Sequence, residues 1–211
     1  MPLFYQQDIN QTTKLGVWKI EEPEDFFQAA VPLQSSITHP HKRLQHLAGR
    51  FLLPFLFPDF PYSEIEIADT RKPFLPDEQY HFSISHCGNY AAAIVSSTDR
   101  VGVDIELITP RVEKIKHKFL HTKELSFVNR HSLDLHIPLL TLLWSTKEAM
   151  FKWWGNGEVD FSEVLLTEEF EFGERGIVPA FFKKDNLNIP LQIHFQLRDG
   201  ISLAWVRGGK S

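Results

Sequence analysis

The stretch Val101-Gly102-Val103-Asp104-Ile105-Glu106-Leu107 predicts a β-strand, because apolar side chains alternate with Gly102, Asp104 and Glu106. Alternate side chains of a strand point to the same face, so Asp104 and Glu106 stand side by side, roughly 6–7 Å apart along the strand. Two carboxylates this close repel each other unless a cation lies between them or one of them is protonated. A hard divalent cation such as Mg²⁺ prefers oxygen ligands of this kind. The stretch therefore suggests half of a metal site.

Acid-x-acid pairs are not rare in this chain, because Glu64-Ile65-Glu66 and Glu169-Phe170-Glu171 repeat the pattern. The solvent-exposed polar face of a strand is the more common reason for such a pair. Asp104 and Glu106 stand out only through the residues that accompany them elsewhere in the chain.

Length and composition fit a globular protein with one large domain or two of about 100 residues. Of its 211 residues 43% are hydrophobic, and eighteen Phe and five Trp predict an aromatic-rich core. A single cysteine, Cys87, excludes an intrachain disulfide and fits a reducing compartment. No basic start followed by an apolar run and no stretch of membrane-spanning length are found. We therefore expect a soluble cytoplasmic protein, and its net charge of −5 argues against a general nucleic-acid binder.

The spacing of apolar residues predicts an α+β protein. A helix is expected over 40–53, with Pro40 in its first turn, Pro54 ending it, and close packing at Gly49. Further helical segments are expected over 110–119, over 122–131 with Thr122 as the N-cap, and over 138–154. The expected strands are 13–20, 62–68, 80–85, 90–97, 101–107, 161–166, 176–182, 191–197 and 201–206.

The order of these elements suggests two α+β halves of similar design, 1–100 and 101–211. Each half has a helix and a strand–turn–strand unit. The strand that carries Asp104 is expected to close a three-stranded meander with strands 80–85 and 90–97.

A second group of polar residues lies on the expected helix over 138–154. Glu148 and Lys152 are one turn apart, and Lys147 is next to Glu148. Together with Asp104 and Glu106, Glu148 would make three carboxylates around one Mg²⁺ and a diphosphate. A lysine one turn away can neutralise phosphate charge or protonate a leaving oxygen. The plainer alternative is an ion pair between Glu148 and Lys152, worth a few tenths of a kcal/mol.

The segment 111–131 begins with an excess of positive charge. Before Glu124 it has one acid, Glu113, and five basic residues, which are Arg111, Lys114, Lys116, Lys118 and Lys123. Such a patch could bind an acidic partner, or it could be an ordinary solvated helix face.

The two motifs together resemble the signature of the 4′-phosphopantetheinyl transferases. The first, 102–106, matches Gly-x-Asp-x-Glu, and the second, 144–152, matches Trp-x-x-Lys-Glu-Ala/Ser-x-x-Lys. Arg71-Lys72-Pro73 and Phe82-Ser83-Ile84-Ser85-His86 resemble two further motifs of this family, and 119–124 resembles its Phe-x-x-x-Glu segment. The length and layout are similar to the monomeric, Sfp-type branch, in which two pseudo-symmetric α+β halves place the site at their interface.

This resemblance implies roles for the residues of the second half. Asp104, Glu106 and Glu148 would hold Mg²⁺ on the diphosphate of coenzyme A, and Ile105 leaves no third carboxylate on the strand. Glu148 is also a candidate to accept the proton of the attacking serine. Lys152 would stabilise the diphosphate and the departing 3′,5′-ADP. The segment 111–131 falls where the family grips its acidic acyl or peptidyl carrier protein.

The resemblance also implies that the first half binds the nucleotide of coenzyme A. Ser85 and His86 would bind its phosphates, with His86 at the 3′-phosphate, and Lys72 would lie near the adenine or its phosphates. Arg43 could reach the 3′-phosphate from the first helix. The roles of three further residues stay open, namely Arg50, Glu124 and Lys147.

The expected activity is that of a monomeric, Mg²⁺-dependent holo-[acyl-carrier-protein] synthase. It would transfer 4′-phosphopantetheine from coenzyme A to a carrier serine and release 3′,5′-ADP. A metal-dependent phosphodiesterase and a non-catalytic module that binds coenzyme A or a carrier are the alternatives. The ten histidines show no spacing typical of a zinc site. The sequence does not name the carrier.

Overall fold

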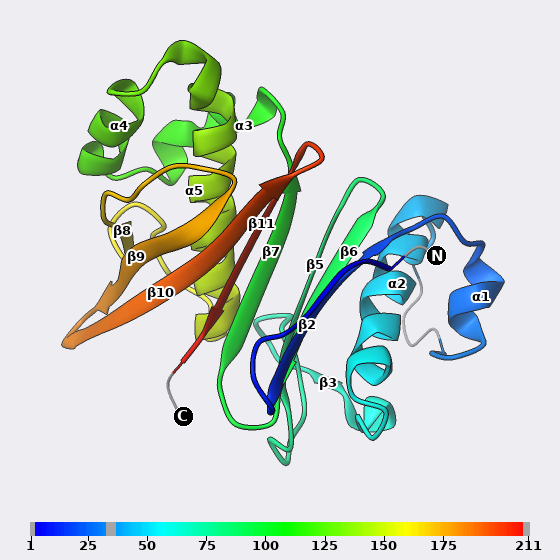
Figure 1. Cartoon of the computed structure of the whole chain (residues 1–211). Helices are drawn as coiled ribbons and strands as arrows, with labels where there is room; N and C mark the ends of the chain where they lie inside the picture. Colours follow the sequence, from blue (N-terminus) through cyan, green and yellow to red (C-terminus); the bar gives the residue numbers. More distant parts are fainter. Residues whose placement is uncertain (1–2, 33–36, 209–211) are drawn as a thin grey trace. The chain divides into compact units, whose positions relative to one another are not determined.

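The computed structural model describes residues 3–32 and 37–208 (Figure 1). Helices and sheets occur in both halves of the chain, and the predicted α+β class is confirmed. Contacts along the chain divide it into a first unit, Met1–Val101, and a second unit, Gly102–Gly208. Each unit packs a long helix against a sheet of its own.

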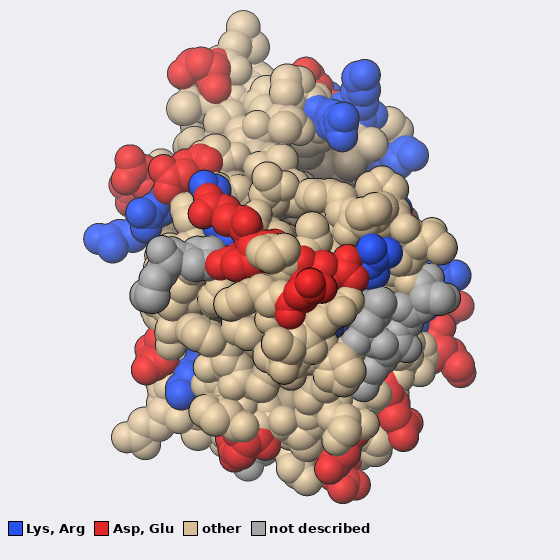
Figure 2. Space-filling model, turned by 90° about the vertical axis from the view of Figure 1, so that its right-hand side faces the viewer, with Lys and Arg blue, Asp and Glu red and all other residues tan. Residues whose placement is uncertain are grey.

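The helices and the charged side chains bear on the expectations for membranes and for partners. Within the described residues, no helix has the length and apolar character needed to cross a membrane. On the face shown in Figure 2, acidic side chains gather near the centre, and Lys and Arg side chains lie in separate small groups.

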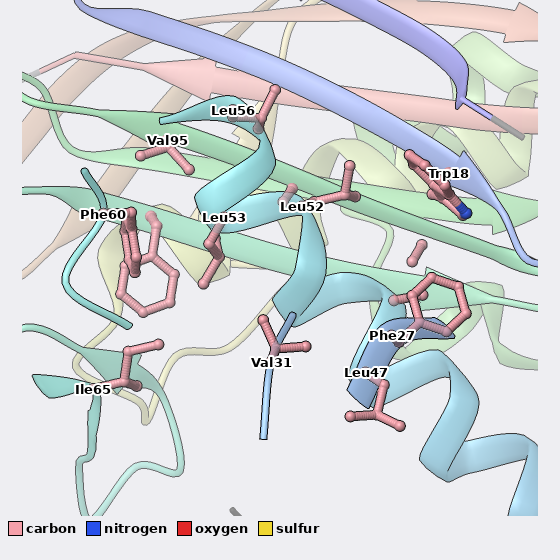
Figure 3. Packing of buried hydrophobic residues seen from close by; sticks show 14 of the residues in the cluster. Trp18, Phe27, Val31, Leu47, Leu52, Leu53, Leu56, Phe60, Ile65 and Val95 are labelled. Carbon is pink, nitrogen blue, oxygen red and sulfur yellow. The ribbon is translucent and has the colours of Figure 1, made fainter. Parts of the chain in front are cut away.

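The first unit is built on a four-stranded antiparallel sheet in the order β1-β2-β6-β5. Its strands are β1 (Leu3–Asp8), β2 (Thr13–Lys19), β5 (His81–Cys87) and β6 (Tyr90–Ser96). Helix α2 (Pro40–Leu56) packs on this sheet and buries Leu47, Leu52 and Leu53 in a cluster with Trp18 and Phe27 (Figure 3). The smaller elements are α1 (Glu24–Gln28), η1 (Tyr62–Glu64), β3 (Glu66–Ile67) and β4 (Pro73–Phe74).

Helix α2 follows the prediction in its packing but not in its end. A Cβ on Gly49 would lie 2.5 Å from Cγ2 of Ile84, so the predicted close packing at this glycine is confirmed. The helix does not stop at Pro54 but continues to Leu56, because Leu53 and Leu56 are both buried in the core. A proline this near the helix end removes one backbone hydrogen bond, a loss that burial of the last turn can offset.

The segment after α2 also differs from the prediction. The strand expected over 62–68 is instead the 3-10 turn η1, followed by the two-residue strand β3. Its alternating pattern does not mark a buried face, since both residues of β3 are exposed. The prediction also missed β1, which pairs with β2 at the edge of the first sheet.

The second unit is built on a five-stranded sheet in the order β7-β11-β10-β9-β8. Its strands are β7 (Val101–Leu107), β8 (Leu165–Thr167), β9 (Arg175–Lys184), β10 (Leu187–Arg198) and β11 (Ile201–Arg207). Helix α5 (Leu133–Trp154) packs on this sheet, where Met150 and Trp153 join a cluster with Phe182, Ile193 and Phe195. Its smaller helices are α3 (Arg111–Ile115), η2 (Lys116–Lys118) and α4 (Thr122–Asn129).

The prediction that β7 closes a meander with the two preceding strands was wrong. β6 pairs with β2 and β5, whereas β7 is the first strand of the second sheet and lies next to β11. An alternating pattern identifies a strand with one buried face, but it does not identify the strand's partner. The partner of β7 comes almost at the end of the chain.

Two helix starts were also predicted wrongly. Helix α5 begins at Leu133, with Pro138 inside it, instead of near Pro138. The N-cap of α4 is His121 and not Thr122. Nδ1 of His121 accepts a hydrogen bond from the Lys123 N–H at 3.3 Å, and Glu124 accepts one from the His121 N–H at 2.7 Å, which completes a capping box.

Candidate active site

Gly102 lets strand β7 lie directly against helix α5. A Cβ at this position would overlap the carbonyl oxygen of Ala149 and would lie 2.7 Å from the backbone nitrogen of Trp153. Only glycine allows the backbones of a strand and a helix to approach this closely. The contact sets the two motifs of the sequence side by side, because Ala149 follows Glu148 directly.

Asp104 is almost completely buried and is paired with Lys152 of α5. Its Oδ1 accepts a hydrogen bond from Lys152 Nζ at 2.7 Å. The Asp104 side chain is 4% exposed and that of Lys152 is 25% exposed. A buried carboxylate needs a partner of opposite charge, and the helix supplies it.

Glu106 is contacted by the first residue of the helix motif. The indole Nε1 of Trp144 donates to Glu106 Oε1 at 3.3 Å. The ring of Trp144 is itself packed between Phe119 and Phe161. Sequence reasoning did not name Trp144 as a candidate, although its place in the motif was visible. The two ends of the helix motif thus contact the two carboxylates of the strand motif.

Glu148 lies on α5 within electrostatic reach of both strand carboxylates. Burial raises the pKa of Glu148 to about 7, the negative charge of Asp104 adds to this, and Lys152 opposes it. At neutral pH the group is therefore close to half protonated. A carboxyl in this state can accept or donate a proton under ordinary conditions.

The residues present fit Mg²⁺ by their chemistry. Carboxylate oxygens are the ligands that Mg²⁺ prefers, and the charges of Asp104 and Glu106 both raise the pKa of Glu148. No three His, Cys, Asp or Glu side chains in the described ranges are already arranged as a metal site. Ile105, between the two strand carboxylates, is fully buried in the core.

Lys147 is separated from these groups although it is next to Glu148 in sequence. Its side chain is fully buried and pairs with Glu124 at 2.6 Å. Burial lowers the pKa of the Lys147 ammonium, and the Glu124 carboxylate opposes that shift. Lys147 and Glu124 form a contact inside the second unit, on another face of α5.

The candidate residues Ser85, His86, Lys72 and Arg43 all belong to the first unit. Ser85 is buried and His86 exposed near the end of β5, where they pair with Ala92 and Ala91 of β6. Burial, with a smaller effect of Arg100, lowers the pKa of Lys72 to about 8. Nε of Arg43 donates to Glu24 at 2.7 Å, and its NH1 donates to the Ile37 carbonyl at 3.0 Å.

Arg50 lies on the same helix as Arg43 but in a different environment. It is 5% exposed, and burial lowers the pKa of its guanidinium. One turn earlier, His46 has a pKa lowered to about 4 by burial and by the charges of Arg50 and His86. Sequence reasoning missed His46, although its i,i+4 spacing to Arg50 was visible. Arg43 is paired with Glu24 and Arg50 is buried, so the two arginines do not act as one pair although they lie on one helix.

Known proteins with similar sequences include two whose names contain the activity that the motifs suggested. Residues 100–198 match the family model described as 4′-phosphopantetheinyl transferase superfamily. "Enterobactin synthase component D" of Salmonella typhi is 32% identical over 114 residues, which are 53% of this chain and 47% of the relative. "4′-phosphopantetheinyl transferase AcpT" of Escherichia coli K12 is 31% identical over 114 residues, 53% of this chain and 57% of the relative. "4′-phosphopantetheinyl transferase ffp" of Bacillus subtilis is 36% identical over 102 residues, 46% of this chain and 45% of the relative.

The chain spans about half the length of the curated relatives it matches. Among solved structures, the holo-[acyl-carrier-protein] synthase (AcpS) of Thermotoga maritima matches with a TM-score of 0.42 and 21% identity. That match covers 53% of this chain and 63% of the AcpS chain. The family model covers both motifs, which lie together in the second unit. The resemblance is thus confirmed, because the segment 100–198 of this chain matches the family model of the 4′-phosphopantetheinyl transferase superfamily.

Proposed function

We propose that this protein transfers 4′-phosphopantetheine from coenzyme A to a serine of an acyl or peptidyl carrier protein and releases 3′,5′-ADP. The observation that carries this proposal is the meeting of β7 and α5 at Gly102. It brings the Asp104–Lys152 pair, the Trp144–Glu106 hydrogen bond and the raised pKa of Glu148 together in one unit. The similarity of residues 100–198 to phosphopantetheinyl transferases supports the same activity.

The transfer reaction requires stabilisation of negative charge and one proton acceptor. The serine hydroxyl attacks the β-phosphorus of coenzyme A, and the bond to the leaving 3′,5′-ADP breaks. Glu148, with a pKa of about 7, accepts the proton of the serine. Lys152 faces the negative charge that grows on the leaving phosphate. Trp144 orients Glu106 through its indole N–H.

Mg²⁺ is part of the proposal as the ion held by Asp104, Glu106 and Glu148. When bound, it neutralises charge on the diphosphate. With the metal in place, the ammonium of Lys152 would be shared between Asp104 and the diphosphate of coenzyme A. A cation at this place would relieve the repulsion that Asp104 and Glu106 exert on the charged form of Glu148.

The remaining parts of the reaction are assigned to the two halves of the chain. We assign nucleotide binding to the half 1–100, through Lys72, Ser85, His86 and Arg43. Arg43 would have to exchange its ion pair with Glu24 for a phosphate. Residues 101–211 would bind the metal, and the exposed basic residues of 111–131 would meet an acidic carrier.

Two observations weigh against the alternatives. A phosphodiesterase acting on nucleic acid would benefit from an excess of positive charge, whereas the net charge is −5. A module that only binds coenzyme A has no need of a buried carboxyl with a pKa near 7.

The decisive experiment mixes the purified protein with coenzyme A, Mg²⁺ and a panel of apo carrier proteins from fatty-acid, polyketide and peptide synthesis. The expected result is a carrier that gains the mass of one phosphopantetheine, with 3′,5′-ADP in equal amount. Glu148→Gln should abolish transfer while coenzyme A binding, measured by calorimetry, persists. Hydrolysis of coenzyme A without transfer, or no transfer to any carrier in the panel, would overturn the proposal.

A further inference from the structure

Every proton of the Lys147 ammonium is used inside the protein. Its Nζ donates to the Phe119 carbonyl at 2.6 Å, to Glu124 Oε2 at 2.6 Å and to the Phe161 carbonyl at 2.8 Å. An ammonium group has three donors and no more. The side chain is also 0% exposed, so Lys147 has neither a proton nor a surface to offer to a phosphate.

The carboxylate of Glu124 is equally saturated. Its Oε2 accepts from Lys147 and from the His121 N–H at 2.7 Å. Its Oε1 accepts from the N–H of Thr167 at 2.8 Å and from the Thr167 hydroxyl at 2.9 Å. Four hydrogen bonds match the capacity of an ionised carboxylate. One buried ion pair thus joins the start of α4, the middle of α5 and strand β8.

This ion pair also completes the edge of the sheet. β8 is the terminal strand of its sheet and pairs with β9 alone. Glu124 accepts the N–H of Thr167, which a further strand would otherwise bind. The position of Glu124 is therefore fixed by the sheet, and through Glu124 the sheet fixes Lys147.

The consequence concerns the rotation of α5 about its axis. Neighbouring residues of an α-helix project about 100° apart, since each turn has 3.6 residues. Lys147 is held on one face by its three acceptors, and Gly102 holds the backbone of Ala149 from another side. Glu148 lies between these two anchors in sequence, so its direction is set by both.

We propose that Lys147 and Glu124 are positioning residues, which lock the rotation of α5 so that Glu148 is aimed at Asp104 and Glu106. The motif 144–152 would then contain two lysines of different kinds. Lys152 meets the carboxylates and the substrate, while Lys147 acts only through the helix. This inference rests on the proposed function, because the aim of Glu148 matters only if that group works in the reaction.

The test compares three variants that separate contact from positioning. Glu124→Gln keeps the shape of the side chain but removes its charge, and Lys147→Met keeps most of its length but removes its donors. Lys152→Met serves as the variant that loses a substrate contact. Lys183→Met is the matched control, because Lys183 is an exposed lysine of the same unit outside the proposed site. Thermal melting first establishes which variants are folded.

The expected result is a split between binding and turnover. In folded Glu124→Gln and Lys147→Met, kcat should fall about 10- to 100-fold, as is typical when a group behind a catalytic residue is lost. Their dissociation constants for coenzyme A, measured by calorimetry without Mg²⁺, should stay within about twofold of wild type, whereas that of Lys152→Met should rise about tenfold or more. Thr167→Val removes one hydrogen bond to Glu124 and provides a milder test if Lys147→Met does not fold.

A second readout does not depend on turnover. The Mg²⁺ concentration that half-saturates thermal stabilisation should rise several-fold in Glu124→Gln and stay unchanged in Lys183→Met. Loss of coenzyme A binding in Lys147→Met as large as in Lys152→Met would overturn the inference. So would wild-type kcat and Mg²⁺ response in folded Glu124→Gln. If wild type transferred nothing to any carrier, the proposed function would be wrong. The Mg²⁺ titration would still test the positioning role of Lys147 and Glu124.

Discussion

The ammonium of Lys152 lies 2.7 Å from Oδ1 of Asp104, so the last residue of the helix motif is paired with the first carboxylate of the strand motif. The pair has one nearly buried member and one that reaches the surface. It therefore contributes to the fold as well as to the proposed site, and the two contributions can be separated by mutation.

Replacing Lys152 by Met removes the ammonium partner of a buried carboxylate. We expect the free energy of unfolding to fall by about 1–3 kcal/mol, less than for a fully buried pair because Lys152 is partly exposed. Adding Asp104→Asn should restore part of this loss, because the buried charge is then gone. Urea denaturation of the two single variants and the double variant measures the coupling, and strictly additive changes would contradict it.

Gly102→Ala should be among the most damaging single-methyl changes in this protein. The new Cβ would meet backbone atoms of Ala149 and Trp153, which cannot turn away as a side chain can. We expect a loss of about 3 kcal/mol or more in the free energy of unfolding. Gly173→Ala is the control, because a Cβ built there has no atom within 4 Å apart from those of the glycine and its two chain neighbours. Equal melting temperatures of the two variants would refute the close approach of β7 and α5.

Glu148→Gln should stabilise the protein while it removes transferase activity. The pKa of Glu148 is about 7 in the folded protein, above its ordinary value of 4.5, so the folded state binds the proton more tightly than the unfolded state. The stability that the neutral carboxyl contributes is therefore lost as the pH rises from 4.5 to about 7. Above pH 7 the buried negative charge destabilises the folded state. The variant should exceed wild type by about 1–2 kcal/mol at pH 8, after allowance for partial exposure, with little difference near pH 4. Denaturation curves at both pH values test this.

Trp144→Phe should weaken metal binding more than it weakens the fold. Phenylalanine keeps the aromatic packing with Phe119 and Phe161 but cannot donate to Glu106. The cost in unfolding free energy should be about 1 kcal/mol. The Mg²⁺ concentration required for half-maximal activity should rise about tenfold. An unchanged Mg²⁺ requirement would show that this hydrogen bond does not orient Glu106.

His46 should make the protein less stable in weak acid. Burial, Arg50 and His86 hold its pKa at about 4 in the folded state, below the ordinary value of 6.5. Between these pH values His46 is protonated in the unfolded chain but not in the folded one. The free energy of unfolding therefore falls as the pH drops from 6.5 to 4. His46→Gln should remove on the order of 1–2 kcal/mol of this decline. Melting curves of both proteins at pH 7 and pH 4.5 are compared, and parallel losses would contradict the shift.

The parts of the fold that depend on local pattern could be predicted from the sequence. Strand β7 and the helix that carries Glu148 were recognised from their periodicity, and the two motifs identified the family. The partner of β7 could not be predicted, because β11 lies about 100 residues later and alternation is the same for any partner. The helix boundaries at Pro54 and Pro138 depended on burial of the neighbouring turns, which overrode the local effect of proline.

The environment of single charged residues could not be predicted from the sequence either. Lys147 and Lys152 look alike in the sequence, yet one is fully buried and the other is partly exposed. Arg43 and Arg50 differ in the same way on α2. The difference comes from residues far along the chain, such as Glu124 for Lys147 and Asp104 for Lys152. Spacing on a helix gives the face of a residue but not what covers that face.

The contact between Gly102 and Ala149 also limits how the length of this protein can change. A residue inserted between Ala149 and Lys152 would turn Lys152 by about 100° and move it about 1.5 Å along the axis, away from Asp104. An insertion in the loop between α5 and β8 would leave the same contacts in register. Insertions and deletions among related chains should therefore collect between the elements that carry the two motifs and be absent within 144–152.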